Sequence, residues 1–551
     1  MTRRLRCWAA AVAAMAAVAL TGCTAMPTEG PVVRSDVVVS DPGDAENVPE
    51  GPHAGAGPSD LVESFLLAGA TGFGDDFVTA REYFSGEARE AWKPLAGVVV
   101  AGPFTTAQTS KTQVTLDVPV LARIDGEGRY TEAPPDARES VTYDLVRNAD
   151  GEWRIASAPD GLVISSVVFE TQFRSASVYF LAADEKNLVP ETRWFPVEHL
   201  PTHVMKALIA GPSPWLRDAV RTAVPDGTQL KPDAVEIDAA GTALVRLAPM
   251  ASVLAADRGP MLAQIYASLL PLSGVGSVQV KTGEVILEDP DDLESGTQPD
   301  GTLEFLQAGQ LVGLDGRTTT PVAGVASLDG LGLRHPARNE DGSLRVAVAN
   351  GSAVVTLPEA DKPSVTLVSG QRLVAPSVDR FGWVWTASSG GGLVVGHVGG
   401  EQVAVKADFL DGREVRSVRV ARDGTRVAVI SAGTDGVTLN VGAVTRDAKG
   451  APQQIGEVIQ AGATLTDATA VVWADESTLA VLGRSAGTLT VHRVPVSGPT
   501  VRLPEVADVD GLAGGRLLYV STTEGALRRE GPASWAEVPG VTDVLDPSYP
   551  G

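Results

Sequence analysis

This sequence has few cysteines, and its basic residues are outnumbered by acidic ones. Each of these features argues against certain classes of function. The only cysteines among 551 residues are Cys7 and Cys23, and a chain that loses Cys7 with a leader peptide can form no internal disulfide. With a single cysteine left, cysteine-ligated zinc and iron–sulfur sites are excluded as well. The 44 Lys and Arg are outnumbered by 68 Asp and Glu, for a net charge of −24. Such a surface does not favour a nucleic-acid partner or electrostatic binding to anionic lipid.

Histidine is also rare, with six in the chain. His199 and His203 are four residues apart in an expected helix, a spacing that zinc can use. A metalloprotease motif needs Glu directly after the first His, and Leu200 stands there instead. A surface or packing role is therefore the favoured interpretation of this pair. The other histidines are scattered singly, at His53, His335, His397 and His492.

Sequence signals for catalysis are few. Gly483-Arg484-Ser485-Ala486-Gly487 matches the nucleophile-elbow pattern, but it lies between two strand-like runs, which favours a hairpin turn. No phosphate-binding Walker loop and no dinucleotide fingerprint are present. Acidic pairs such as Asp75-Asp76 and Asp184-Glu185 are expected to be solvated surface. We therefore expect no enzyme, no catalytic residues, no cofactor and no metal.

Long hydrophobic runs are missing except at the start of the chain. After Arg3, Arg4 and Arg6, the 13 uncharged residues from Trp8 to Leu20 are too short to span a membrane but suit a signal peptide. The run ends in Leu20-Thr21-Gly22-Cys23, the bacterial lipobox pattern. We expect residues 1–22 to be removed and Cys23 to become an N-palmitoyl, S-diacylglycerol cysteine. Two or more acyl chains anchor a protein stably, so we expect a lipid-anchored protein on the extracytoplasmic face of the cell membrane.

Composition and periodicity then divide the chain. Residues 23–58 are rich in Pro, Gly, Ser and acidic residues, which indicates a flexible tether. Residues 59–169 predict an α+β domain. Ser59 and Asp60 can cap a first helix, a second follows from Phe77 to Trp92, and four strand-like runs complete the domain. The aromatic residues of these helices are interpreted as core, with a ligand cavity as the alternative.

Residues 170–288 alternate between strand and helix. Strands are expected at 177–181, 187–197, 235–237, 243–247 and 278–280, and helices at 198–210 and 259–270. The segment resembles a GerMN domain, a non-catalytic module of germination, sporulation and some envelope proteins. The motifs that carry the resemblance are Val178-Tyr179-Phe180, the run from Leu188 to Arg193, the helix end from Ala207 to Pro212, and Val224-Pro225-Asp226-Gly227-Thr228.

An acidic linker at 289–302 leads into an all-β region, residues 303–551. A turn entering an apolar strand recurs there, with its second position at 342, 382, 424, 476 and 515. A period near 40 residues indicates a β-propeller, and a β-sandwich is the alternative. Five turns predict five blades, and the run 303–314 could add another, so five to seven are expected. We attribute the longest interval to a polar insertion at 446–455.

Taken in order, these segments resemble the actinobacterial lipoprotein LpqB family. The resemblance implies a membrane-tethered accessory of a two-component system, which engages the extracytoplasmic domain of an MtrB-like sensor histidine kinase and promotes phosphorylation of the regulator MtrA. Cell-envelope homeostasis and division are the implied processes. Only Cys23 carries over as a functional residue. The alternatives are an envelope hydrolase with two carboxylates in a cleft, or a receptor for a wall fragment bound in the propeller channel.

Overall fold

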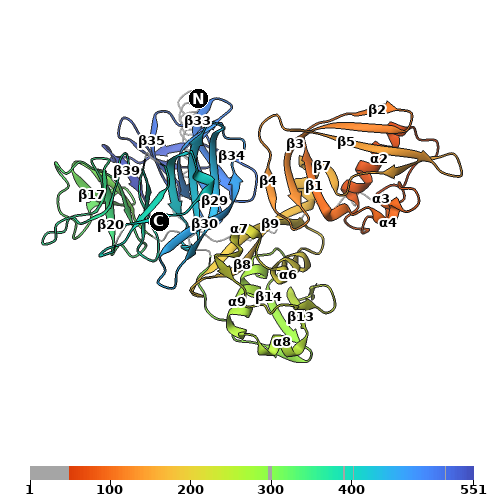
Figure 1. Ribbon diagram of the computed structural model, residues 1–551, viewed down its shortest axis with the longest axis horizontal. Helices are drawn as coiled ribbons and strands as arrows, with labels where there is room; N and C mark the ends of the chain where they lie inside the picture. Colours follow the sequence, from red (N-terminus) through yellow and green to blue (C-terminus); the bar gives the residue numbers. More distant parts are fainter. Residues whose placement is uncertain (1–48, 296–300, 389–390, 401, 516) are drawn as a thin grey trace, which may run out of the picture. The chain divides into compact units, whose positions relative to one another are not determined.

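The computed structural model describes residues 49–295, 301–388, 391–400, 402–515 and 517–551 (Figure 1). Residues 49–551 form one compact unit. The expected signal peptide, Cys23 and the part of the expected tether up to residue 48 lie outside the described residues. Within the described ranges, no helix is long and apolar enough to cross a membrane.

The first part of the chain folds around a seven-stranded sheet in the order β6-β5-β3-β1-β7, with β2 and β4 also paired to the long strand β3. Only the β1–β7 pairing is parallel. Helix α2 packs on this sheet through Leu61, Val62 and Phe65. The elements are α2 (Pro58–Thr71), α3 (Val78–Arg81), α4 (Ala88–Ala91), η1 (Pro94–Ala96), β1 (Gly97–Ala101), β2 (Thr106–Ser110), β3 (Gln113–Asp125), β4 (Tyr130–Glu132), β5 (Arg138–Arg147), β6 (Trp153–Ser157), β7 (Leu162–Ser165) and α5 (Ser166–Gln172).

Both expected helices of this part need correction. The first begins at Pro58 with Gly57 as its N-cap, and Asp60 accepts the backbone N–H of Gly57 from inside the first turn. The second is split into α3 and α4, because the chain between them pairs with β6 through Phe84 and Ile155. The aromatic side chains of this region are buried in one core, as the packing interpretation expected.

The next part contains two smaller sheets, β10-β8-β9 and β11-β13-β14-β15, with β12 also paired to β13. Its elements are β8 (Phe173–Ala182), β9 (Leu188–Pro196), α6 (Leu200–Ala210), α7 (Pro214–Arg217), β10 (Val220–Arg221), β11 (Gln229–Leu230), β12 (Glu236–Ile237), β13 (Thr242–Ala248), α8 (Met250–Ala255), α9 (Arg258–Leu269), β14 (Ser277–Thr282) and β15 (Val285–Leu287). The expectation that a strand at 278–280 is the last was wrong. Gly283 adopts a φ of 57°, and the chain turns back into β15.

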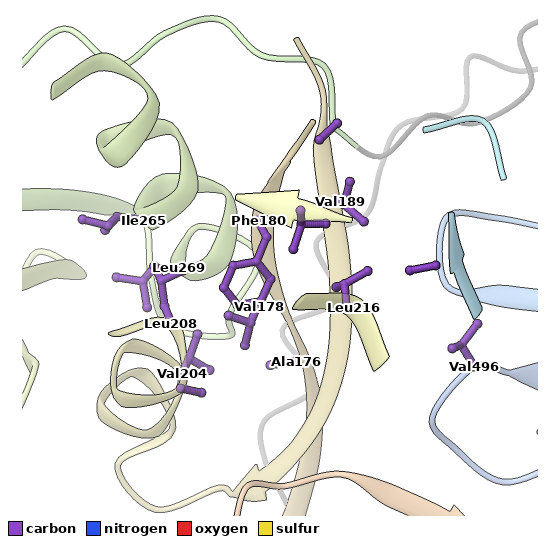
Figure 2. Close-up of a cluster of buried hydrophobic side chains, with 14 of the residues drawn as sticks. Ala176, Val178, Phe180, Val189, Val204, Leu208, Leu216, Ile265, Leu269 and Val496 are labelled. Carbon is purple, nitrogen blue, oxygen red and sulfur yellow. The ribbon is translucent and has the colours of Figure 1, made fainter. Parts of the chain in front are cut away.

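The core of this part lies between β8 and the helices α6 and α9. Figure 2 shows Val178 and Phe180 of β8 among Leu208 of α6 and Leu269 of α9. The same cluster of buried side chains continues through Leu216 of α7 to residues of the propeller, including Val496. The two parts therefore share one hydrophobic core.

The C-terminal region is a six-bladed propeller, within the expected range, and each blade is a four-stranded sheet. The blades are β39 (Leu545–Ser548) with β16 (Leu303–Gln307), β17 (Gln310–Asp315) and β18 (Thr318–Pro321); β19 (Leu333–Arg338), β20 (Arg345–Ala349), β21 (Ala353–Thr356) and β22 (Thr366–Ser369); β23 (Ser377–Val378), β24 (Val384–Ala387), β25 (Leu393–Gly396) and β26 (Val403–Val405); β27 (Glu414–Val420), β28 (Arg426–Gly433), β29 (Gly436–Arg446) and β30 (Pro452–Ala461); β31 (Asp467–Trp473), β32 (Thr478–Ser485), β33 (Thr488–Pro495) and β34 (Val501–Arg502); and β35 (Val509–Ala513), β36 (Tyr519–Thr522), β37 (Leu527–Glu530) and β38 (Trp535–Glu537). A short helix, η2 (Asp408–Leu410), precedes the fourth blade.

The recurring sequence turn joins the innermost strand of a blade to its second strand, and we call it the inner turn. Gly342, Gly382 and Gly424 adopt the expected positive φ, of 70°, 80° and 70°. Glu476 and Gly515, at the same place in their turns, do not. The first blade has no inner turn, because its innermost strand β39 comes from the end of the chain and its second strand β16 from the start of the propeller. Five turns therefore accompany six blades.

The fourth blade has unusually long strands. The residues attributed to an insertion at 446–455 instead extend the β29–β30 hairpin, whose strands have 11 and 10 residues. The helix α7 contacts both of these strands. The end of this hairpin contacts the third blade, where Arg446 pairs with Asp379.

Candidate functional site

The junction between the propeller and the part before it is centred on Arg426, at the start of β28. Its side chain is 2% exposed, and its Nε and Nη2 donate to Asp423 Oδ2 at 2.9 and 2.6 Å. The same guanidinium donates to Pro190 O of β9 at 3.3 Å and to Glu476 O at 2.6 Å. One buried cation therefore joins β9 to two neighbouring inner turns.

Two further contacts cross this junction. The Tyr179 hydroxyl of β8 donates to Glu476 Oε1 at 2.6 Å, and burial together with this carboxylate raises the pKa of Tyr179. Asp184 pairs with Arg380 of an inner turn at 2.6 Å. Burial alone would raise the pKa of Asp184, but its hydrogen bond to Arg380 and the charge of that residue hold it below its ordinary value. Both tyrosine and aspartate therefore keep their ordinary charge states at neutral pH.

The N-terminal domain contacts the propeller at the loop after β33. Glu132 accepts the backbone N–H and the hydroxyl of Thr500, at 2.8 and 2.7 Å. The indole N–H of Trp194 donates to Ser497 O at 2.8 Å, and the backbone N–H of Tyr130 donates to Ser497 Oγ at 3.3 Å. This loop is thus held by residues of both preceding parts.

A cavity of about 370 Å³ lies where the three parts meet, and its lining includes the carboxylates Asp125, Glu191 and Glu457. Asp125 is bound to Arg129 and to turn N–H groups, and Glu191 accepts from Arg193 and from the N–H of Ser213. Glycoside hydrolysis needs one carboxyl group as acid and a second as base or nucleophile. Two of the three carboxylates of the cavity therefore hold the chain through hydrogen bonds.

A second pocket lies on the propeller axis, at the carboxyl ends of innermost strands. It is lined by Ala337, Val420, Trp473, Ala513 and Ser548 at those ends, together with the side chains of Arg419 and Arg422 and the last residues of the chain. Its cavity of about 30 Å³ has room for one or two water molecules, whereas ligand pockets typically reach about 300 Å³ or more. A saccharide or peptide does not fit inside the channel.

Two models of one protein family match this chain, one at each end of the described structure. The model described as "Lipoprotein LpqB, N-terminal domain" matches residues 51–170, and "Lipoprotein LpqB beta-propeller domain" matches residues 309–550. Between them, a model described as "Sporulation and spore germination" matches residues 177–284. The chain belongs to the LpqB lipoprotein family. The middle match also agrees with the expected GerMN-like domain.

Relatives named "Lipoprotein LpqB" align along most of the chain. The relative from Streptomyces avermitilis is 28% identical and the alignment covers 97% of each chain. That from Cutibacterium acnes is 28% identical, over 89% of this chain and 88% of the relative. That from Mycobacterium tuberculosis is 25% identical, over 75% and 76%. The similarity therefore covers all three parts of the described structure.

In this LpqB-family chain, the serine of the elbow-like motif occupies a hairpin. Ser485 ends β32, and Ala486 and Gly487 turn the chain into β33 with positive φ angles of 51° and 87°. A nucleophile elbow needs a helix after the turn, and a strand follows here. The hairpin interpretation is confirmed.

The expected histidine pair is not brought together as a metal site. His199 is the exposed N-cap residue of α6, whereas His203 stacks on Phe195. Burial lowers the pKa of His203, so it is neutral at pH 7. Among the described residues, no group of three or more His, Cys, Asp or Glu could hold a metal ion.

The other histidines and carboxylates considered in the sequence make structural contacts. His335 pairs with Asp546, and His492 is buried in β33, where burial lowers its pKa. Two carboxylates expected to be solvated surface are not: Asp75 accepts the N–H of Thr79 at the start of α3, and Asp184 pairs with Arg380.

Sequence reasoning missed the arginines that organise the junction and the axis. Arg426 is the third residue after Asp423 and Arg345 the fourth after Asp341, but each is the first residue of the second strand of its blade. An arginine repeated at the start of this strand was a signal for a shared structural role. Arg419 and Arg422 carry no such repeat, and only the closed propeller places them on its axis.

Proposed function

We propose that this chain is a lipid-anchored extracytoplasmic scaffold that engages an MtrB-like sensor histidine kinase and promotes phosphorylation of its response regulator. The lipobox and the resemblance to the LpqB family support anchoring through Cys23. The anchor confines the protein to the membrane surface, beside the extracytoplasmic domain of a membrane kinase.

The observation that carries the scaffold proposal is the way the three parts are joined. Glu132 binds Thr500, Trp194 binds Ser497, and Arg426 joins β9 to two inner turns. Interfaces between domains of one chain are often small and allow relative motion. A shared core and buried hydrogen bonds instead hold several binding surfaces in fixed positions, which suits a protein that presents them to a partner.

The direct test is reconstitution with the kinase. The full-length chain in detergent should capture the purified extracytoplasmic domain of the kinase, and in membranes it should increase phosphotransfer to the regulator. Failure to bind at both low and moderate salt would contradict the proposal. Cys23→Ala should lose palmitate labelling and leave the membrane fraction, and unchanged labelling and fractionation would contradict the anchor.

A matched pair of variants tests whether fixed geometry matters. Glu132→Ala removes the carboxylate that binds Thr500, whereas Glu139→Ala removes an exposed carboxylate of the same sheet that pairs with Arg123. Kinase stimulation should fall in the first and not in the second. Equal activity of both variants would show that the join between domains is irrelevant to signalling.

A further inference from the structure

The axial pocket contains two partly buried arginines, Arg419 and Arg422, that differ from the buried arginines of the propeller. Arg426, Arg446 and Arg338 each have a carboxylate oxygen within 3.2 Å, from Asp423, Asp379 and Glu304 respectively. Among the described residues, neither Arg419 nor Arg422 has a carboxylate oxygen within 4 Å. Both arginines therefore line the pocket without a carboxylate partner from the protein.

Their hydrogen bonds leave donors unused. Arg419 Nη1 donates to carbonyl oxygens of Ala375, Pro376 and Val418 at 3.1, 3.2 and 2.8 Å. Arg422 Nη2 reaches only Gly514 O, at 3.4 Å, and its buried Nε has no partner among the described residues. A guanidinium has five N–H donors, so both groups retain donors that no protein acceptor uses, and both residues line the pocket.

Burying a cation without a counter-ion is costly, and the pKa values reflect this. Burial lowers the pKa of both Arg419 and Arg422 to about 10, so both remain charged at neutral pH. Glu340, Asp475 and Asp423 raise the pKa of Arg422, but less than burial lowers it. Positive charge in this pocket is therefore only partly compensated by the protein.

We propose that the axial pocket of the propeller binds one small carboxylate group, held by the guanidinium groups of Arg419 and Arg422. The guanidinium fork matches the geometry of a carboxylate and can bind both of its oxygens. The cavity of about 30 Å³ has room for about two water-sized atoms, which matches the two oxygens of one carboxylate group. The carboxylate can belong to a free small acid or to the end of a peptide whose remainder stays outside. This site is independent of the sensor-kinase proposal.

The test measures carboxylate binding to the full-length chain in detergent, in a buffer free of carboxylates. Acetate is titrated and followed by saturation-transfer NMR of its methyl group, with acetamide as the neutral molecule of the same shape. Acetate should bind with a millimolar dissociation constant and raise the melting temperature, and acetamide should do neither. Equal behaviour of the two would overturn the proposal.

Variants assign the binding to the pocket. Arg422→Gln should weaken acetate binding about tenfold or more, because it removes a charge-assisted hydrogen bond. Arg416→Gln is the matched control, since Arg416 lies on the same strand β27 but pairs with Asp467 at 2.5 Å. It should bind acetate like the wild type. Unchanged binding in Arg422→Gln would overturn the assignment.

Two further measurements complete the design. If Arg422→Gln does not fold, as judged by circular dichroism, Arg422→Lys is measured instead. It keeps the charge but not the fork, so a folded Lys variant should bind acetate more weakly than the wild type, and unchanged binding would overturn the assignment. N-acetyl-glycyl-glycine distinguishes the sources of the carboxylate. If N-acetyl-glycyl-glycine binds more tightly than acetate, the carboxylate belongs to a peptide end. If only acetate binds, it belongs to a free small acid.

Discussion

Asp423 shows how a single carboxylate serves both a turn and a domain junction. Its Oδ1 accepts the backbone N–H groups of Thr425 and Arg426, which closes the inner turn. Its Oδ2 accepts both Nε and Nη2 of Arg426, whose guanidinium then reaches Pro190 and Glu476. The local turn geometry therefore orients the side chain that crosses to β9.

Removing Arg426 should be strongly destabilising. Arg426→Ala leaves the carboxylate of Asp423 buried without its partner, and breaking a buried ion pair costs about 3–5 kcal/mol. Urea denaturation of the full-length chain measures this loss. Arg416→Ala removes a more exposed ion pair, between β27 and Asp467 of β31, and should cost about 1 kcal/mol or less. Similar losses for the two variants would contradict the assigned role.

At the scale of single residues, the sequence predicted the turn at Asp423 and Gly424 but not the contact that Arg426 makes with β9. Asp423 and Gly424 are visible as a motif because the chemistry of a tight turn is local. The partner of Arg426 is a carbonyl 236 residues earlier in the chain, so no local pattern can reveal it. The same holds for Asp184, which resembled a surface residue until Arg380 was placed beside it.

At the scale of elements, the strand β39 decides whether the propeller is a closed ring. It pairs with β16, and its Asp546 accepts hydrogen bonds from the side chain of Arg334 and the backbone N–H of His335, both in β19. Asp546 also pairs with the ring of His335 at 2.9 Å. One nearly buried carboxylate thus joins the last strand of the chain to the neighbouring blade.

Ring closure through Asp546 should depend on pH. Burial alone would raise its pKa, but the hydrogen bonds and charges of His335 and Arg334 hold it far below the value of about 3.9 for an unfolded aspartate. Its contribution is therefore complete above about pH 5 and is lost as the pH falls below 4, toward the folded pKa. At pH 6, Asp546→Asn should cost about 1.5–3 kcal/mol.

Urea denaturation between pH 6 and pH 2 checks this expectation. The stability difference between the wild type and Asp546→Asn should shrink as the pH falls, because protonation removes the charge of Asp546 in the wild type as well. A difference that stays constant over this range would contradict the assigned ion pairs.

Elements were predicted from the sequence wherever their pattern is local. The helices at 200–210 and 258–269 and the strands β8 and β9 were anticipated by periodicity. The split of the second helix was not, because pairing of Phe84 with Ile155 overrides helical periodicity. The first blade could not be counted from turns, because its two inner strands, β39 and β16, come from opposite ends of the propeller sequence.

For the whole molecule, the shared core has a thermodynamic consequence. Trp215 and Leu216 of α7 belong to the same buried cluster as Val441 and Val481 of the propeller. The N-terminal domain has a core cluster of its own, built around residues such as Phe65. The GerMN-like part and the propeller should therefore unfold together.

Two cavity-forming variants test this coupling by hydrogen exchange. Trp215→Ala and Phe65→Ala each remove a buried aromatic side chain, at a cost of about 3–5 kcal/mol. Trp215→Ala should reduce protection both in β8 and in the blade β27–β30. Phe65→Ala should reduce it mainly in β1, β3 and β5. Loss confined to β8 in the first variant would contradict a shared core.

The order of domains was readable from the sequence, because each has its own periodicity and repeat. Their junctions were not, because they depend on single side chains such as Glu132 and Trp194 that look ordinary in sequence. Composition and spacing therefore predicted the architecture, while the cavity between the three parts and the pocket on the axis emerged only from the fold.

The first blade combines β39 with β16, so the propeller ring cannot close before β39 is present. The chain is synthesised from its amino end, so the ring stays open until β39 has been made. A nonsense mutation or proteolytic nick that removes Leu545–Ser548 would leave β16 with an unpaired edge, which is a template for aggregation.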